Sequence, residues 1–146
     1  MKIRLVVLSL TVLLAGCGGP FVLLPGGALD GSVEETPASW TFTDEVDTIQ
    51  LETDPADPYS VNIWVVALDG SLYVHAGANR STWIENMEAD PNVRFQVEQS
   101  IYELAAARVE TQEEFDRFSD AYETKYGNRP RNESVAEAYL FRLGPR

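Results

Sequence analysis

The sequence has few of the residues that build metal centres and cross-linked folds. It contains one cysteine, Cys17, and one histidine, His75. A lone thiol closes no intramolecular disulfide, and a lone imidazole without cysteine partners excludes a structural zinc site. The proline-rich turn around Asp54 and Asp57 does not make an EF-hand loop, so we expect no metal. The Gly-x-Ser-x-Gly nucleophile elbow of serine hydrolases is also missing.

Positive charge is scarce as well. Lys and Arg total 11 against 23 Asp and Glu, which gives a formal net charge of −12. Phosphate backbones and anionic membrane surfaces repel such an acidic chain, whereas the charge suits solubility in an exported compartment. The composition therefore predicts no nucleic-acid partner.

The apolar run near the start of the chain is too short to cross a bilayer. Leu5–Ala15 is apolar apart from Ser9 and Thr11. As a helix it spans roughly 16 Å, about half of the ~30 Å hydrocarbon core. A short basic start, Met1–Arg4, precedes it. This order is typical of a signal peptide and not of a transmembrane helix.

The run ends in Leu14-Ala15-Gly16-Cys17, which resembles the lipobox of bacterial lipoproteins. The resemblance implies cleavage before Cys17 and attachment of diacylglycerol to its thiol, with stable anchoring by two or three palmitate-like chains. The alternative is an ordinary secretory signal with an accidental cysteine. Gly18 stands where an aspartate often signals inner-membrane retention. We therefore expect a cell-envelope protein, held in the outer membrane if the cell is Gram-negative.

These signals divide the chain into a signal peptide (1–16), a lipidated tether or linker (17–39) and one domain (40–146). Loss of Lys2 and Arg4 with the signal peptide changes the formal net charge from −12 to −14. Glycine and proline interrupt any periodicity in the tether, which is typical of a linker. The apolar Phe21–Leu24 beside the lipid either rests on the bilayer or docks on the domain.

Six segments of the domain have the residue pattern of strands. Residues 59–68 are apolar on both faces, which predicts a central position in a sheet. Asp69-Gly70 is typical of a hairpin turn, and we expect a second tight turn near Gln99-Ser100. The expected strands are 49–52, 59–68, 71–76, 92–99, 101–109 and 135–143.

Two helices are expected between the strands, over 82–89 and 112–126. The capping-box spacing Thr-x-x-Glu begins at Thr82 and again at Thr111, and Gly127 follows the second helix. This order of elements predicts an α+β, mainly β fold, in which the two helices pack on the ends of a small antiparallel barrel. One face of the second helix, predicted to be core, holds Phe115, Phe118, Ala121 and Tyr122.

One hairpin carries a further resemblance. Residues 63–74 read Ile-Trp-Val-Val-Ala-Leu-Asp-Gly-Ser-Leu-Tyr-Val, and a small-residue loop, Arg80 and a helix with Trp83 follow. Together with the strand start Pro91–Arg94 and the order of elements, this resembles the split β-barrel flavin-binding superfamily. That superfamily includes pyridoxamine phosphate oxidase-like proteins and deazaflavin-dependent nitroreductases. The resemblance covers roughly 40–143 and implies an antiparallel split β-barrel with two inserted helices, a fold that tends to form homodimers.

The resemblance implies an FMN or deazaflavin site at the loop after this hairpin. Gly77 allows tight backbone passage, the Arg80 guanidinium suits phosphate, and the free amides of the following helix favour an anion. Trp64 and Trp83 are core residues or stack on a planar ligand. His75 packs or, in a haem-binding split barrel, serves as an axial ligand. The expected cofactor-binding residues are Trp64, His75, Gly77, Asn79, Arg80, Ser81, Thr82 and Trp83.

Two features oppose this site. The turn 53–60 holds two aspartates and no base, where cofactor-binding members carry Arg or Lys. Arg80 could equally be a solvated residue at a helix start, with Ser81 and Thr82 acting only as caps. The leading hypothesis is therefore an anchored binding or accessory protein with a weak site for a planar or anionic small molecule near Arg80. The alternatives are a flavin- or deazaflavin-dependent, nitroreductase-like oxidoreductase of the cell envelope and a structural homodimer.

Overall fold

The computed structural model describes residues 19–146, so the predicted signal peptide and Cys17 lie outside the described residues. Within the described part, no helix is both long and apolar enough to span a membrane. The elements are β1 (Ser32–Val33), η1 (Thr41–Thr43), β2 (Thr48–Thr53), β3 (Tyr59–Leu68), β4 (Ser71–His75), α1 (Thr82–Ala89), β5 (Asn92–Val97), β6 (Ser100–Arg108), α2 (Gln112–Tyr126), η2 (Val135–Glu137) and β7 (Leu140–Pro145).

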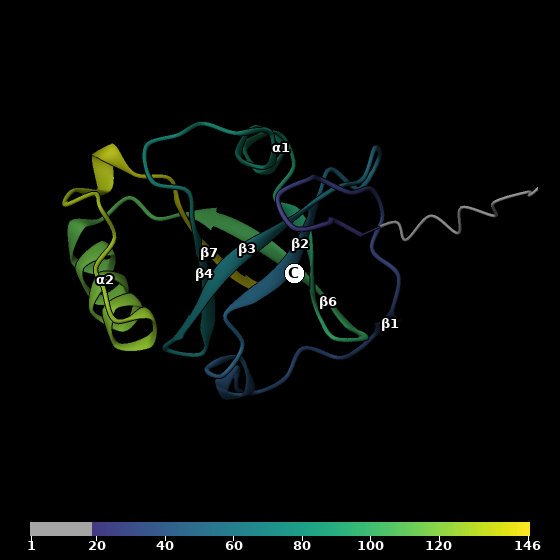
Figure 1. The fold of residues 1–146 in the computed structure, drawn as a ribbon, viewed down its shortest axis with the longest axis horizontal. Helices are drawn as coiled ribbons and strands as arrows, with labels where there is room; N and C mark the ends of the chain where they lie inside the picture. The colour runs from purple at the N-terminus through teal and green to yellow at the C-terminus, as the bar shows by residue number, and fades with distance from the viewer. Residues whose placement is uncertain (1–18) are drawn as a thin grey trace, which may run out of the picture.

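Six antiparallel strands close into a barrel, and the short β1 lies beside it (Figure 1). The strands follow the order β6-β5-β2-β3-β4-β7, and β7 pairs back with β6. β1 runs parallel to the first two residues of β6, Ser100 and Ile101, whereas β7 pairs with Leu104–Arg108. The predicted mainly β fold, an antiparallel barrel with two helices, is confirmed.

β3 buries apolar side chains on both of its faces, as its apolar pattern predicts. It lies between β2 and β4 in the sheet. Val65 is buried in the barrel, and the next residue, Val66, is buried in a second cluster with α2. At the end of β3, Asp69 and Gly70 both have positive φ, 51° and 76°. Two positive φ values are typical of the type I′ turn, whose twist matches that of a hairpin.

The barrel interior is filled with aliphatic and aromatic side chains. α1 closes it by contributing Trp83, Ile84 and Met87 to the same cluster. Burial of each large apolar side chain contributes roughly 1.5–3 kcal/mol relative to its exposure. The interior side chains from the strands are Ile49, Leu51, Val65, Leu72, Val74, Val93, Phe95, Leu104, Phe141 and Leu143.

α2 packs on the outer face of β3 and β4 (Figure 1). The predicted cap is confirmed, because the Thr111 side chain accepts a hydrogen bond from the Glu114 backbone N–H. Gly127 ends the helix with a left-handed φ of 76°, as its C′ position predicts. Phe115, Phe118 and Tyr122 are buried on one face, so the predicted core stripe is also confirmed.

The predicted capping box at Thr82 is wrong by one residue. Ser81 has the extended backbone of an N-cap, and Thr82 is already helical. The Ser81 side chain makes no capping hydrogen bond, and its Oγ is enclosed without a partner among the described residues. The start of α1 is therefore set by its packing in the barrel and not by a side-chain cap.

Two other elements differ from their predictions. The expected strand 135–143 is split, because the Ser134 side chain accepts from the Ala136 N–H and caps the short helix η2. Such a local side-chain bond competes with ladder pairing, and β7 begins only at Leu140. The tight turn between β5 and β6 is Glu98-Gln99, because Val97 pairs with Ser100.

Part of the predicted tether packs on the barrel and does not behave as a linker. Gly26 and Ser60 exchange two backbone hydrogen bonds of 2.9 Å. Leu29 is buried, and Ser32–Val33 forms β1. Gly26 is required here, because a Cβ at this position would lie 2.3 Å from the Gly19 carbonyl carbon. The glycines that predict flexibility therefore allow close backbone contact.

Candidate functional site

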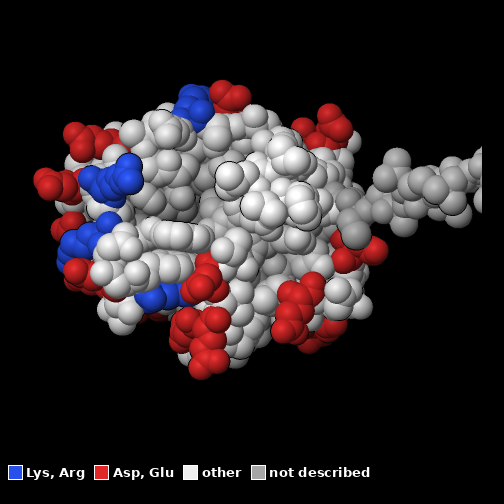
Figure 2. All heavy atoms as spheres, viewed as in Figure 1, with Lys and Arg blue, Asp and Glu red and all other residues white. Residues whose placement is uncertain are grey.

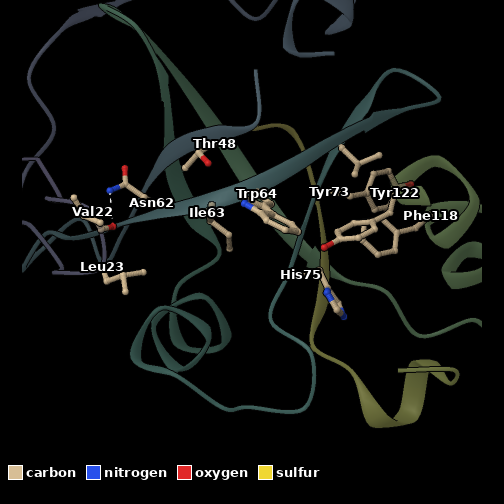
Figure 3. Close-up of a pocket in the computed structure, with 11 residues that line it drawn as sticks. Val22, Leu23, Thr48, Asn62, Ile63, Trp64, Tyr73, His75, Phe118 and Tyr122 are labelled. Carbon is tan, nitrogen blue, oxygen red and sulfur yellow. Dashed lines mark hydrogen bonds between the residues drawn. The ribbon is translucent and has the colours of Figure 1, made fainter. Parts of the chain in front are cut away.

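A groove lies between the outer face of β3–β4 and α2 (Figure 3). Its volume is about 470 Å³, which falls within the range of small-molecule sites. Val22 and Leu23 line one end, and His75, Phe118 and Tyr122 line the other, with Trp64 between them. We call this cavity the aromatic groove; it is lined by Val22, Leu23, Thr48, Asn62, Ile63, Trp64, Val66, Tyr73, His75, Phe118 and Tyr122.

The period-two repeat of the two strands creates the wall of the aromatic groove. Asn62, Trp64 and Val66 alternate along β3 and therefore share its outer face. Val66 pairs with Tyr73 of β4, and His75 lies two residues farther on the same face. These alternate positions of β3 thus face the groove, while Val65 between them is buried in the barrel.

Trp64 is the exposed aromatic residue of this wall. It is 48% exposed, although it sits in a strand between two others. Its ring stacks on Tyr126 with centroids 4.6 Å apart and an interplanar angle of 16°. The Tyr126 hydroxyl accepts from the Val65 N–H at 3.1 Å and lies 2.8 Å from the Val65 carbonyl oxygen. These contacts hold Trp64 in place before any ligand arrives.

His75 is a neutral imidazole at this site. Burial lowers its pKa to about 4, so it is uncharged at neutral pH. Its Nε2 accepts a hydrogen bond from the Gly77 N–H at 3.2 Å. We assign the ring proton to Nδ1 from this bond. The imidazole can therefore donate one hydrogen bond and cannot supply positive charge.

Tyr122 supplies a second polar group to an otherwise apolar region. Burial raises the pKa of its phenol, so the hydroxyl stays protonated at neutral pH. It has no hydrogen-bond partner among residues 19–146, and the side chain lines the aromatic groove. His75 lies beside it, with ring centroids 6.4 Å apart. Both groups can bind a carbonyl or ring nitrogen of a ligand.

The aromatic groove continues into a second cavity of about 490 Å³. Trp64, His75 and Tyr122 line both cavities, so the two are continuous. The additional lining comes from the loops after β4 and after α2. We call this the polar end; its further lining residues are Ala76, Gly77, Ala78, Asn79, Asn128, Arg129, Pro130, Arg131 and Asn132.

The polar end carries the positive charge of the site. Arg129 is paired with Asp120 and Glu123. Arg131, in contrast, is exposed and makes no ion pair within residues 19–146. On the face seen in Figure 2, Lys and Arg gather on the α2 side, and Asp and Glu dominate the lower rim. An anionic group at the polar end would therefore meet an available guanidinium.

Four of the predicted site residues line these cavities. Trp64 and His75 line both, and Gly77 and Asn79 line the polar end. Gly77 has a φ of 59°, and a Cβ there would lie 3.2 Å from Asn132 Oδ1. The predicted need for glycine in this loop thus has a backbone reason.

The other four predicted residues line neither cavity. Arg80 Nη2 pairs with Glu88 at 2.6 Å and Arg80 Nε pairs with Glu85 at 3.2 Å. Arg80 is therefore a half-exposed residue paired with carboxylates of α1, the helix that follows it. Trp83 is buried in the barrel core, because it is on the face of α1 that covers the barrel. Ser81 and Thr82 are the N-cap and the first residue of α1.

Sequence reasoning missed the loop Asn128–Asn132, which contributes Arg131. Its signal is a pair of arginines in a chain with few cations. Phe118 and Tyr122 were expected only in the core, but they also face the aromatic groove. The acidic turn 53–60, which was expected to oppose an anionic ligand, is not part of the site. Asp54 accepts from the N–H groups of Ala56 and Asp57, and this turn lines neither part of the site.

Residues 40–139 match the family DUF2255, described as an uncharacterized protein conserved in bacteria. Because this match spans more than half of the sequence, the chain belongs to that family. No curated protein sequence matches it.

Several solved structures share the fold. The conserved hypothetical protein Rv2991 of Mycobacterium tuberculosis has 22% identity and a TM-score of 0.60, over 73% of this chain and 77% of that chain. HutZ, a heme storage protein from Vibrio cholerae, has 20% identity and a TM-score of 0.57 over 73% and 86%. A FAD-binding protein from Mesorhizobium loti has 16% identity and a TM-score of 0.50 over 73% and 86%. Identities this low show the fold alone, an antiparallel barrel that this chain shares with a heme storage protein and a FAD-binding protein.

Proposed function

We propose that this DUF2255 protein is a lipid-anchored binding protein of the cell envelope whose site takes a planar, anionic aromatic molecule of flavin type. The observation that carries the proposal is Trp64, half exposed yet stacked on Tyr126 and open to the groove. Exposed, immobilised aromatic rings contribute stacking energy at little cost in side-chain entropy. The shared fold of a FAD-binding protein agrees with this ligand class.

The aromatic groove fits the ring part of such a ligand. Trp64 offers one ring face, while Phe118 and Tyr122 come from the opposite element, α2. The His75 imidazole and the Tyr122 hydroxyl offer hydrogen bonds to ring carbonyls and nitrogens. This mixture of an apolar wall and a few polar groups is common in cofactor sites.

The polar end fits the anionic part. Arg131 is the leading phosphate contact, because no carboxylate within residues 19–146 is paired with it. Arg80, with Ser81 and Thr82, is a second candidate next to Asn79. A phosphate at Arg80 would have to compete with Glu85 and Glu88 for the same guanidinium. Bound ligand would owe its redox chemistry to its own ring; this chain would orient and enclose it.

A heme is less well matched to the site. Axial ligation normally uses a free imidazole nitrogen, but His75 Nε2 already accepts from Gly77. Ligation through that atom would cost this hydrogen bond and would move the loop that begins the polar end. Binding of flavin needs no such change.

The lipid anchor rests on the motif Leu14–Cys17 and is tested separately. We expect full-length protein expressed in a bacterium to be membrane-bound, and its mature N-terminal peptide to carry diacylglycerol on Cys17. Cys17→Ser should abolish both the added mass and the membrane association. Unmodified Cys17 in the mature protein would overturn the anchor without affecting the ligand site.

Ligand binding is tested by titrating residues 17–146 carrying Cys17→Ser with FMN and with riboflavin, which lacks the phosphate. Trp64→Ala should weaken both ligands roughly tenfold, because a stacking partner is lost. Arg131→Ala should weaken FMN several-fold and leave riboflavin unchanged. Arg80→Ala tests the second candidate for the phosphate contact. Arg117→Ala is the matched control, since this exposed arginine pairs with Asp69 away from the site.

Three results would contradict the proposal. These are no binding of either ligand at ~100 μM, binding that is insensitive to Trp64→Ala, or a riboflavin affinity that falls with Arg131→Ala. If only Arg80→Ala weakens FMN, the phosphate contact moves to the start of α1. Gel filtration of free and bound protein gives the oligomeric state.

A further inference from the structure

We propose that the apolar turn Phe21–Leu24 contacts the lipid bilayer and seats the domain on the membrane. The proposal rests on the proposed lipid anchor at Cys17, and it adds a second contact that fixes orientation. The turn exposes four consecutive large apolar residues: Phe21 by 74%, Val22 by 66%, Leu23 by 94% and Leu24 by 66%. Contiguous apolar surface of this kind marks an interaction site.

The turn is ordered by contacts to itself and to β3. Phe21 and Leu24 exchange backbone hydrogen bonds of 3.0 and 2.8 Å. Asn62 Nδ2 donates to the Val22 carbonyl oxygen at 2.9 Å, as Figure 3 shows. The peptide groups of Phe21 and Leu24 and the Val22 carbonyl are therefore paired already, which lowers the cost of moving the turn into an apolar phase. The apolar side chains point outward because the backbone is held this way.

The position of the turn in the chain points to the lipid bilayer as the surface that covers its apolar side chains. Phe21 is four residues beyond Cys17. A fully extended chain spans ~3.6 Å per residue, so the Cα of Phe21 lies within roughly 14 Å of that of Cys17. Acyl chains on Cys17 hold that residue at the membrane surface. The turn is therefore within reach of the headgroups.

The charge distribution agrees with a neutral lipid contact. In Figure 2, the centre of the face that carries the 20–26 segment is uncharged, and acidic side chains lie toward its rim. The formal net charge of −14 that remains after loss of Lys2 and Arg4 gives the protein no general attraction to anionic lipids. The contact should therefore arise from burial of apolar side chains, and anionic lipid should weaken it.

This orientation has a consequence for the groove. Val22 and Leu23 line the aromatic groove as well as forming the tip of the turn. With the turn in the bilayer, this end of the groove faces lipid, and the polar end lies toward the aqueous side. Amphiphilic ring compounds could then enter from the membrane.

The experiment uses residues 17–146 with Cys17→Ser, which removes the sole cysteine. Leu23→Cys in this background gives a unique site for an environment-sensitive nitrobenzoxadiazole label. Glu133→Cys is the matched control, since this exposed residue follows Arg131 and Asn132 of the polar end and lies outside the apolar turn. We expect phosphatidylcholine vesicles to brighten and blue-shift the label at position 23 and not at 133. Brominated acyl chains should quench only the former.

Further single substitutions test whether burial of apolar side chains drives the membrane contact. Phe21→Ser and Leu24→Ser should each reduce partitioning roughly tenfold, in line with loss of one buried apolar side chain. Phe42→Ser, at an exposed apolar residue outside the turn, should have no effect. Replacing part of the phosphatidylcholine by phosphatidylglycerol should weaken binding, and added salt should restore it.

The outcomes are decisive in both directions. A short tether supplies an effective concentration of the order of millimolar, so a turn that ignores ~10 mM lipid would not insert even when anchored, and the proposal would be overturned. A spectral shift that depends on protein concentration without vesicles would indicate self-association and would also overturn it. Neither result depends on acylation of Cys17 or on flavin binding, which are measured separately.

Discussion

The backbone N–H of Leu29 donates a hydrogen bond of 2.6 Å to Oε2 of Glu52. Glu52 lies in β2 and is only 3% exposed. Arg94 is its register partner on β5 and pairs with the same carboxylate at 3.3 Å. A buried carboxylate with two partners thus fixes the N-terminal segment against the barrel. The segment that carries the apolar turn is therefore positioned relative to the groove.

Replacement of this carboxylate should destabilise the fold. In Glu52→Gln, the charge-assisted bond to Leu29 is lost and Arg94 loses its ion pair, so the free energy of unfolding should fall by about 1–3 kcal/mol. Urea denaturation measures the change, and hydrogen exchange should show faster exchange at the Leu29 amide. Glu103→Gln is the control, because its pair with Arg146 is exposed and contributes little. Equal losses in the two variants would contradict this role.

Lys125 should contribute more to the free energy of unfolding than other charged residues of α2. Its Nζ donates to the carbonyl oxygens of Thr43, Val46 and Val65 at 2.7, 2.9 and 2.8 Å. Lys125→Met leaves these acceptors without the ammonium and should cost about 2–4 kcal/mol in unfolding free energy. Arg117→Met, on the exposed side of the same helix, should cost less than about 1 kcal/mol. A small loss in Lys125→Met would show that water replaces the ammonium.

The single histidine should make stability depend on pH. Burial lowers the pKa of His75 to about 4, against 6.5 for an unperturbed imidazole. Between these values the unfolded chain binds more protons than the folded one, so stability must fall as pH decreases from 6.5 toward 4. The loss should reach up to about 3 kcal/mol.

The pH dependence of stability that comes from His75 can be separated from that of the carboxylates. The His75→Gln variant keeps an acceptor for the Gly77 N–H and removes the titration, so the difference between the two proteins should show the slope. NMR should give one imidazole Hε1 signal that titrates near pH 4. A midpoint near 6.5 would mean that the ring is solvated.

Gly77 should be needed both for stability and for the shape of the polar end. Gly77→Ala places a Cβ at a φ of 59° and 3.2 Å from Asn132 Oδ1, which should cost about 1 kcal/mol and weaken ligand binding. Gly144→Ala is the matched control, because no atom lies within 4 Å of its Cβ position and its φ is not positive. Thermal unfolding and the FMN titration measure both effects. Unchanged values for Gly77→Ala would show that the loop adapts.

Local patterns in the sequence predicted most of the fold. The two-sided apolar pattern of 59–68 identified β3, whose inner face fills the barrel and whose outer face packs against α2. Thr111 and Gly127 marked the ends of α2, since caps depend on neighbouring residues only. The strand expected over 135–143 failed because Ser134 bonds locally and interrupts it. Part of the segment expected to be a linker packs on the barrel, because glycine also permits close backbone contact.

The candidate site was less predictable. Trp64, His75, Gly77 and Asn79 lie within one stretch of chain and could be grouped by resemblance, and they do line the two cavities. The loop around Arg131 lies more than fifty residues later, and no local rule brings it to them. Arg80 has the right chemistry, but its carboxylate partners one and two turns into α1 engage its guanidinium.

The sequence alone determined six of the strands in outline, both α-helices and the hairpin turn at Asp69-Gly70, because each depends on residues a few positions apart. It also predicted an exported, lipid-anchored chain. Only the tertiary structure decided which side chains meet. Closure of the barrel turned one face of β3 toward α2 and left Trp64 half exposed beside His75 and Tyr122. It also set Val22 and Leu23 at the edge of that groove. Contacts between residues forty or more positions apart depend on how elements pack, and no period or motif encodes them directly.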